Sequence, residues 1–373
     1  GQVWDGLDLC EQAQRKARDP AYWWLLALFY MQVELNAHAL EAFREALKWP
    51  EASPPQVHEH MQQTRVELET RVAELSTQLG IPTRQVERGM RAMEEGIRAL
   101  NQGRYADSAS ASRRATRDLG DWPPPHNNLS LALFYDGRPQ EAIAASQRVL
   151  DGDLNNVQAL SNSIRFLVLS GRKDEARRLW ARLVHLKPDG ATERIKAAEA
   201  AAFLQQDQSV YRLLSPLDDK RMLQELSDEF AAQVQYYLAI AEANMGRRGA
   251  ARRLREVRDS YMNAPRLLDA LAHKQPGPGW ATRFPYLSSS ELLPRSAMEE
   301  WIEIVQRQDR LPDFRFRAEV ARFVERYPQM VRVGEKWIWE EELVEPGASL
   351  LTLLDTPAAR AALRRFGLSQ AGE

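Results

Sequence analysis

The chain has 373 residues, of which 44% are hydrophobic and 27% are charged, a composition typical of globular proteins. Its 50 basic and 52 acidic residues give a formal net charge of -2, which excludes a strong overall attraction to nucleic acid or anionic membranes. The single cysteine, Cys10, excludes an internal disulfide framework and a cysteine-rich metal site, and it favours a reducing, cytoplasmic location.

The first predicted helices lie within residues 3–79. Residues 3–18 have helical periodicity and precede a helical hairpin at 21–49, in which Glu34 occupies the turn. The longest apolar stretch, Tyr22 to Val33, is shorter than the roughly 20 residues that span a bilayer, so no membrane association is expected. An extra helix is predicted at residues 57–79 because its apolar residues recur at helical spacing between two proline-containing breaks.

A fixed 34-residue period marks the next part of the chain. Gly103, Gly137 and Gly171 each stand between two helical stretches. Each of these glycines follows the previous one by 34 residues. Ala142 and Ala176 come five residues after the second and third glycines, where a small side chain lets two antiparallel helices approach closely. The pattern predicts hairpins near residues 89–119, 123–153 and 157–188, with weaker copies at 191–216, where Gln205 replaces the glycine, and at 230–260, around Gly246.

These repeats resemble the tetratricopeptide family, whose members share the same period. Trp180 and Pro188, nine and seventeen residues after Gly171, match the bulky and proline positions of that family. The resemblance implies an all-α fold in which residues 1–264 form a right-handed α-solenoid of helical hairpins. It also implies that the chain works by binding other proteins.

The sequence changes character after residue 264. Residues 265–286 contain a proline- and glycine-rich stretch and are predicted to be a linker, followed by a smaller helical module at 287–345. Within that module a β-hairpin is predicted at 330–339, because short alternating stretches flank the Gly334-Glu335-Lys336 turn. Residues 346–373 resemble the start of a HEAT-like helical array. Whether the natural chain continues beyond Glu373 is left open.

No residue pattern points to catalysis. His58 and His60 are the closest histidine pair, but residues two apart on a helix lie about 200° apart and cannot readily share a metal ion. Cys10 lies in an amphipathic helix, where a cysteine is typically a small core residue. Neither a P-loop nor a dinucleotide-binding glycine motif is present. We therefore predict that the chain is not an enzyme and needs no cofactor or metal.

The first helices of the hairpins carry the candidate partner-binding residues. In the tetratricopeptide family the sixth repeat position lies on a concave groove, and here it holds Asn128, Asn162 and Lys196, one period apart from each other. Asparagine can both donate to and accept from a peptide backbone, while Arg165 and Lys196 can hold a carboxylate. The set resembles part of the carboxylate clamp of chaperone-binding domains, with Asn127 in place of an expected lysine. The alternative is that these residues are ordinary solvated positions.

A second set of basic residues lies near the carboxy terminus. Residues 314–326 form a predicted basic helix that, together with the predicted β-hairpin, resembles a winged-helix module in outline. Such modules insert a helix into the major groove and place a hairpin on the DNA backbone. The candidate nucleic-acid contacts are Arg315, Arg317, Arg322, Arg326 and Lys336.

Two classes of function follow from these patterns. The first is a non-catalytic scaffold or adaptor that binds a peptide or protein partner in the groove of the repeats. The alternative is a nucleic-acid-binding regulatory protein that uses its carboxy-terminal module, or a regulatory portion of a larger enzyme. The sequence leaves the partner and the oligomeric state open.

Overall fold

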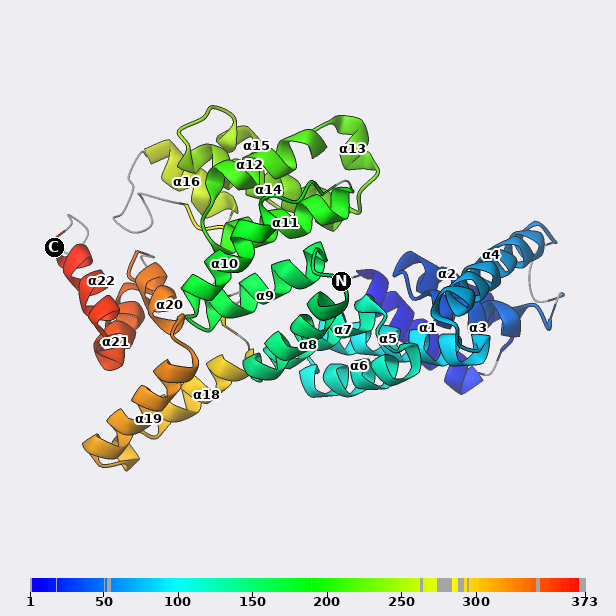
Figure 1. Cartoon of the computed structure of the whole chain (residues 1–373), viewed down its shortest axis with the longest axis horizontal. Helices are drawn as coiled ribbons and strands as arrows, with labels where there is room; N and C mark the ends of the chain where they lie inside the picture. Colours follow the sequence, from blue (N-terminus) through cyan, green and yellow to red (C-terminus); the bar gives the residue numbers. More distant parts are fainter. Residues whose placement is uncertain are drawn as a thin grey trace. The chain divides into compact units, whose positions relative to one another are not determined.

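The computed structural model describes residues 2–17, 19–49, 51, 55–188, 190–261, 264–273, 284–287, 292–293, 295–339 and 343–368. Within these residues the structure is all-helical and contains no strand, so the predicted all-α fold is confirmed. The chain divides into two compact units, Gly1–Leu133 and Phe134–Glu373 (Figure 1). The division falls inside the region 1–264 that was predicted as one repeat array, and each unit is described by itself.

In the first unit neighbouring helices pack in chain order. Helices α2 and α3 pair where the hairpin at 21–49 was predicted, α5 and α6 pair at 89–119, and α4 corresponds to the extra helix at 57–79. The helices are α1 (Gln2–Ala17), α2 (Ala21–Gln32), α3 (Asn36–Ala46), α4 (Pro55–Leu79), α5 (Thr83–Asn101), α6 (Tyr105–Leu119) and most of α7 (Pro123–Tyr135), which crosses into the second unit.

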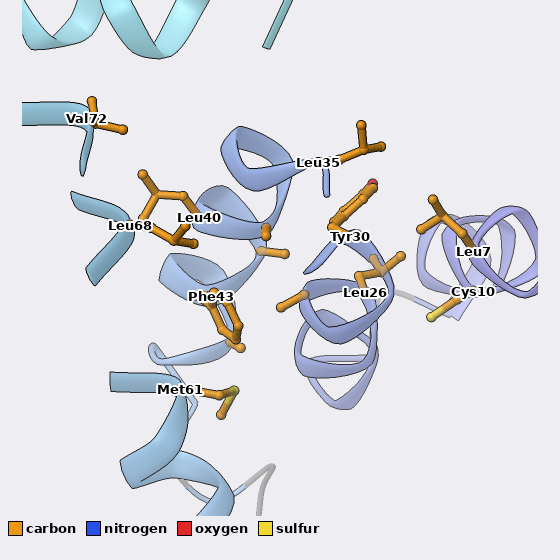
Figure 2. Packing of buried hydrophobic residues seen from close by; sticks show 14 of the residues in the cluster. Leu7, Cys10, Leu26, Tyr30, Leu35, Leu40, Phe43, Met61, Leu68 and Val72 are labelled. Carbon is orange, nitrogen blue, oxygen red and sulfur yellow. The ribbon is translucent and has the colours of Figure 1, made fainter. Parts of the chain in front are cut away.

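The core of the first unit is built from buried apolar residues of α1 to α5, together with Leu119 of α6. Leu26 and Tyr30 of α2 lie between Leu7 of α1 and Phe43 of α3, and Met61 of α4 lies on the far side of Phe43 (Figure 2). All five side chains are buried, with at most 8% of their surface exposed. Removing this apolar surface from water is the main force that holds the hairpins together.

The second unit continues the arrangement of paired helices. Helix α9 contacts α8, α10 and α11, and α11 in turn contacts α12 and α14, so the first helix of each hairpin packs against the first helix of the next. The repeat helices are α8 (Pro139–Gly152), α9 (Val157–Leu169), α10 (Lys173–Leu183), α11 (Ala191–Phe203), α12 (Asp207–Leu214), α13 (Lys220–Gln224), α14 (Asp228–Asn244) and α15 (Ala250–Glu256), with a 3-10 helix η2 (Ser215–Leu217) after α12.

The turns inside the predicted hairpins share one backbone conformation. In each, the second residue after the first helix has a φ between 58° and 76°, whether or not it is glycine. Five of these turns also share a hydrogen bond from the next backbone N–H to the carbonyl five residues earlier, as from Leu35 to Tyr30 at 2.8 Å. The turn residues are Glu34, Gly103, Gly137, Gly171, Gln205 and Gly246.

The regular structure of the carboxy-terminal part consists of helices alone among its described residues. The predicted β-hairpin at 330–339 is wrong, because Met330–Trp337 forms helix α20, which packs against α21 and α22. The predicted linker contains helix α16 (Ala264–His273), while residues 274–283 lie outside the described residues. The remaining helices are α18 (Arg295–Gln306), η3 (Gln308–Arg310), α19 (Asp313–Arg326), α21 (Val344–Leu354) and α22 (Pro357–Gly367), the last two within the segment predicted as HEAT-like.

Candidate functional site

The predicted partner-binding residues of the second unit lie on the adjacent helices α9 and α11. Arg165 of α9 is held between two aromatic rings, with its guanidinium carbon 5.1 Å from the ring centre of Tyr135 and 5.3 Å from that of Phe203. The Arg165 guanidinium also donates a hydrogen bond to the Tyr135 hydroxyl. Such cation–π stacking fixes the side chain of a residue that is only partly buried.

Lys196 of α11 is already paired within its own helix. Its Nζ lies 3.0 Å from Oε1 of Glu199, one turn along α11. Gln233 of α14 donates to the same oxygen at 2.9 Å, and the Lys196 amine lies 6.0 Å from the ring centre of Phe230. The side chains of Lys196 and Glu199 keep 25% and 19% of their surface exposed. A polar chain therefore joins α11 to α14 on a face that water still reaches.

Asn162 differs from the expectation of a solvent-accessible ladder. Only 6% of its surface is exposed, because α9 is enclosed by α8, α10 and α11. Asn127 and Asn128 belong to the first unit, where Asn127 is 2% exposed and Asn128 is partly buried on α7. Of the predicted set, the structure thus leaves Arg165 and Lys196 as the partly exposed charged groups of the second unit.

The repeat period extends one helix further than the turn glycines indicated. Phe230 follows Lys196 by one period, and Gln233 follows Glu199 by one period, just as Glu199 follows Arg165. Phe230 and Gln233 were not predicted because Gly246 lies seven residues beyond the next expected turn position. Glu199 was not predicted although it lies within the regular phase of the repeats. Seven residues are about two helical turns, so α14 is longer but keeps the same face in register.

The carboxy-terminal basic residues do not form a continuous positive surface. On α19, Arg317 pairs with Asp313 at 3.0 Å and Arg326 with Glu300 of α18. Arg315 and Arg322 are exposed on the same helix. Lys336, expected on the wing, is only 9% exposed within α20. Because Met330–Trp337 forms helix α20, the β-hairpin that a winged-helix module needs is not formed there.

The described residues offer little for other chemistry. They contain no group of three or more histidine, cysteine, aspartate or glutamate residues placed to hold a metal ion. Cys10 is buried, and burial followed by the charge of Glu11 raises the pKa of its thiol, which keeps it protonated at neutral pH. None of the described helices is both long and apolar enough to cross a bilayer.

Comparison with known proteins identifies the central repeats. Residues 133–206 match the tetratricopeptide repeat family, which confirms the predicted resemblance for the region that contains Gly137, Gly171 and Gln205. The chain matches no curated protein. This part of the chain therefore carries tetratricopeptide repeats, a protein–protein interaction motif.

Proposed function

We propose that the chain is a non-catalytic adaptor that binds an extended peptide or protein segment across the first helices α9, α11 and α14. The proposal depends on two rows of side chains on α9, α11 and α14, in which successive members are 34 residues apart. The rows begin within the matched repeats and extend beyond them to α14. One row is Arg165, Glu199 and Gln233, and the other is Asn162, Lys196 and Phe230. In a right-handed array of this family, such rows line the concave groove.

The chemistry of these rows favours a partner segment with an acidic side chain. Arg165 is held in place by Tyr135 and Phe203, so little conformational freedom is lost when its guanidinium binds a carboxylate. Glu199 accepts hydrogen bonds from both Lys196 and Gln233. If a partner carboxylate binds Lys196 instead, Glu199 keeps its hydrogen bond from Gln233. The exchange therefore leaves no charged group of this set without a partner.

The test begins by finding which face the partner touches. A photo-crosslinking amino acid at position 192, an exposed position one turn before Lys196 on α11, is compared with one at position 177 on α10, where Arg177 is 69% exposed. Because Lys196 itself is kept, we expect the partner to be captured from position 192 and not from position 177. The captured partner segment is then purified and titrated against wild type, Lys196→Gln and Arg177→Gln.

We expect Lys196→Gln to weaken binding by about 1–3 kcal/mol, which is roughly a 5- to 150-fold rise in Kd, while Arg177→Gln leaves Kd unchanged. Circular dichroism and thermal melts check that both variants fold as wild type does. Equal crosslinking from the two positions, or equal Kd for the two variants, would show that the partner binds elsewhere. Turnover of a substrate that a point substitution abolishes without unfolding would refute the non-catalytic role.

A further inference from the structure

A buried arginine of the repeats, Arg253, shows how carboxylates can match a guanidinium that is withdrawn from water. Arg253 of α15, whose side chain is 7% exposed, lies 2.6 Å from Asp218 and 3.1 Å from Glu242. Burial lowers the pKa of Arg253, but hydrogen bonds to the two carboxylates outweigh burial and raise it overall. The two carboxylates offset the free-energy cost of removing the guanidinium from water.

Arg332 of α20 lacks such a match. Among the described residues its guanidinium makes no hydrogen bond and no ion pair, although the residue is partly buried. The nearby Glu335 is bound to Arg365 of α22 instead. Burial lowers the pKa of Arg332, and the charge of Glu335 does not restore it. The guanidinium therefore stays charged and has no dedicated counter-ion among the residues that the structure describes.

Arg332 lines a pocket of about 270 Å³ in the second unit. Lys336, 9% exposed, adds a second positive charge to the lining, and Glu335 is the only carboxylate among the described lining residues. Phe284 and Tyr286 add an aromatic wall to the lining. The lining thus brings the Arg332 guanidinium and aromatic side chains to one pocket.

The repeats hold that aromatic wall in place. The side chain of Asn244 on α14 accepts from the backbone N–H of Phe284 at 2.5 Å and donates to its carbonyl at 3.1 Å. The Tyr286 hydroxyl donates to Asp207 at 2.7 Å. Because both residues are fixed by hydrogen bonds to repeat helices, the pocket exists before any ligand binds.

We infer that this pocket binds a small organic anion, whose carboxylate or phosphate group lies against Arg332 and whose apolar part lies against Phe284 and Tyr286. A guanidinium presents two parallel N–H donors that match two oxygens of either group. The pocket is smaller than the sites of drug-sized ligands, which occupy roughly 300–1,000 Å³, so the ligand is a small molecule. This site is separate from the rows of α9, α11 and α14, and its test does not depend on a protein partner.

The experiment titrates the intact chain with benzoate, inorganic phosphate and neutral benzamide at constant ionic strength by calorimetry. We expect benzoate or phosphate to bind wild type and benzamide not to bind. Arg332→Gln should raise Kd at least tenfold, Arg332→Lys should raise it less, and Arg315→Gln, an exposed control on α19, should leave it unchanged. Binding of benzoate alone assigns a carboxylate ligand, and binding of phosphate alone assigns a phosphate ligand.

A stability measurement separates ligand binding from a structural role of Arg332. If its charge is unmatched, Arg332→Gln should leave Tm unchanged or raise it in the absence of anion, whereas Arg253→Gln should lower Tm. The anion that binds should raise the Tm of wild type and not that of Arg332→Gln. A marked fall in Tm for Arg332→Gln, no binding of either anion to wild type, or equal binding to both proteins would overturn the inference.

Discussion

At the residue scale, the hairpin turns place two side chains in a conformation that normally suits glycine. Glu34 and Gln205 have φ values of 60° and 58°, in the left-handed region. A residue with a Cβ pays about 1–2 kcal/mol there. The turn hydrogen bonds are nevertheless as short as in the glycine turns, 2.8 Å from Leu35 to Tyr30 and 2.8 Å from Arg104 to Ala99. Packing of the paired helices therefore imposes the turn on residues that disfavour it.

The turn conformation predicts that substitutions at two turn residues change the free energy of unfolding in opposite directions. Gly246 has a φ of 67° and open space around its missing Cβ, so Gly246→Ala should destabilise the fold by about 1 kcal/mol through backbone strain alone. Glu34→Gly removes the same strain, partly offset by the greater freedom of glycine in the unfolded chain, and should stabilise by up to about 1 kcal/mol. Urea unfolding of both variants measures the two changes. A loss of stability in Glu34→Gly would mean that its side chain, not its backbone, determines the effect.

The candidate residues show what a repeat phase can and cannot predict. The 34-residue spacing placed Arg165 and Lys196 on the first helices α9 and α11, where the structure has them. It could not indicate that Asn162 is 6% exposed, because burial depends on how closely the neighbouring helices approach. It also did not reveal the pairing of Lys196 with Glu199, although spacing by three residues on one helix is a detectable signal.

At the scale of elements, α20 shows why short alternating stretches mislead. Met330 to Val333 alternates as a strand would, but Met330, Gly334 and Ile338 are also spaced by four residues, and all three are buried. Strand propensity in so short a segment is weaker than the burial gained by packing on α21 and α22. The supposed turn residue Gly334 instead lets α21 come close, because a Cβ there would lie 2.9 Å from Leu351.

The close contact between α20 and α21 can be tested at Gly347. A Cβ on this residue of α21 would lie 2.6 Å from the backbone nitrogen of Ile338, which cannot easily move. We expect Gly347→Ala to destabilise the protein by about 1–3 kcal/mol, even though alanine is the better helix former. The matched control is Gly367→Ala on α22, whose Cβ would meet no atom within 4 Å and should be neutral or stabilising.

Urea unfolding followed by circular dichroism measures both changes in stability, because the chain is all-helical in its described residues and its ten tryptophans are spread along the sequence. Equal stability of the Gly347 and Gly367 variants would contradict the close approach of the two helices. It would then favour a looser contact in which α20 is held mainly by α22.

At the scale of the whole molecule, the order of helices could be predicted but the division into units could not. Periodicity and turn residues determine where helices begin and end, and these signals lie within a few residues of one another. The division at residue 133 depends instead on how tightly neighbouring helices interlock. Helices α5 and α6 are an example, since a Cβ on Gly89 would lie 2.5 Å from Leu119 Cγ. Such close contacts have no regular sequence signature.

Stability in an array of helical hairpins should be local, because each hairpin contacts mainly its neighbours in the chain. Phe43 of α3 and Phe323 of α19 are both buried, at 1% and 0% exposed, but they lie in different units. Replacing either with alanine should cost about 3–5 kcal/mol. In a local array that cost raises amide hydrogen exchange by roughly two to three and a half orders of magnitude only near the substitution.

We therefore expect Phe43→Ala to raise exchange in α2 to α5 while α19 to α22 keep wild-type protection, and Phe323→Ala to do the converse. Hydrogen exchange measured by mass spectrometry on the same peptides in both variants makes each variant the control for the other. If either substitution raised exchange throughout the chain, the two compact units would unfold as one. A substitution in the first unit would then also open the rows of α9, α11 and α14 and the Arg332 pocket, although both belong to the second unit.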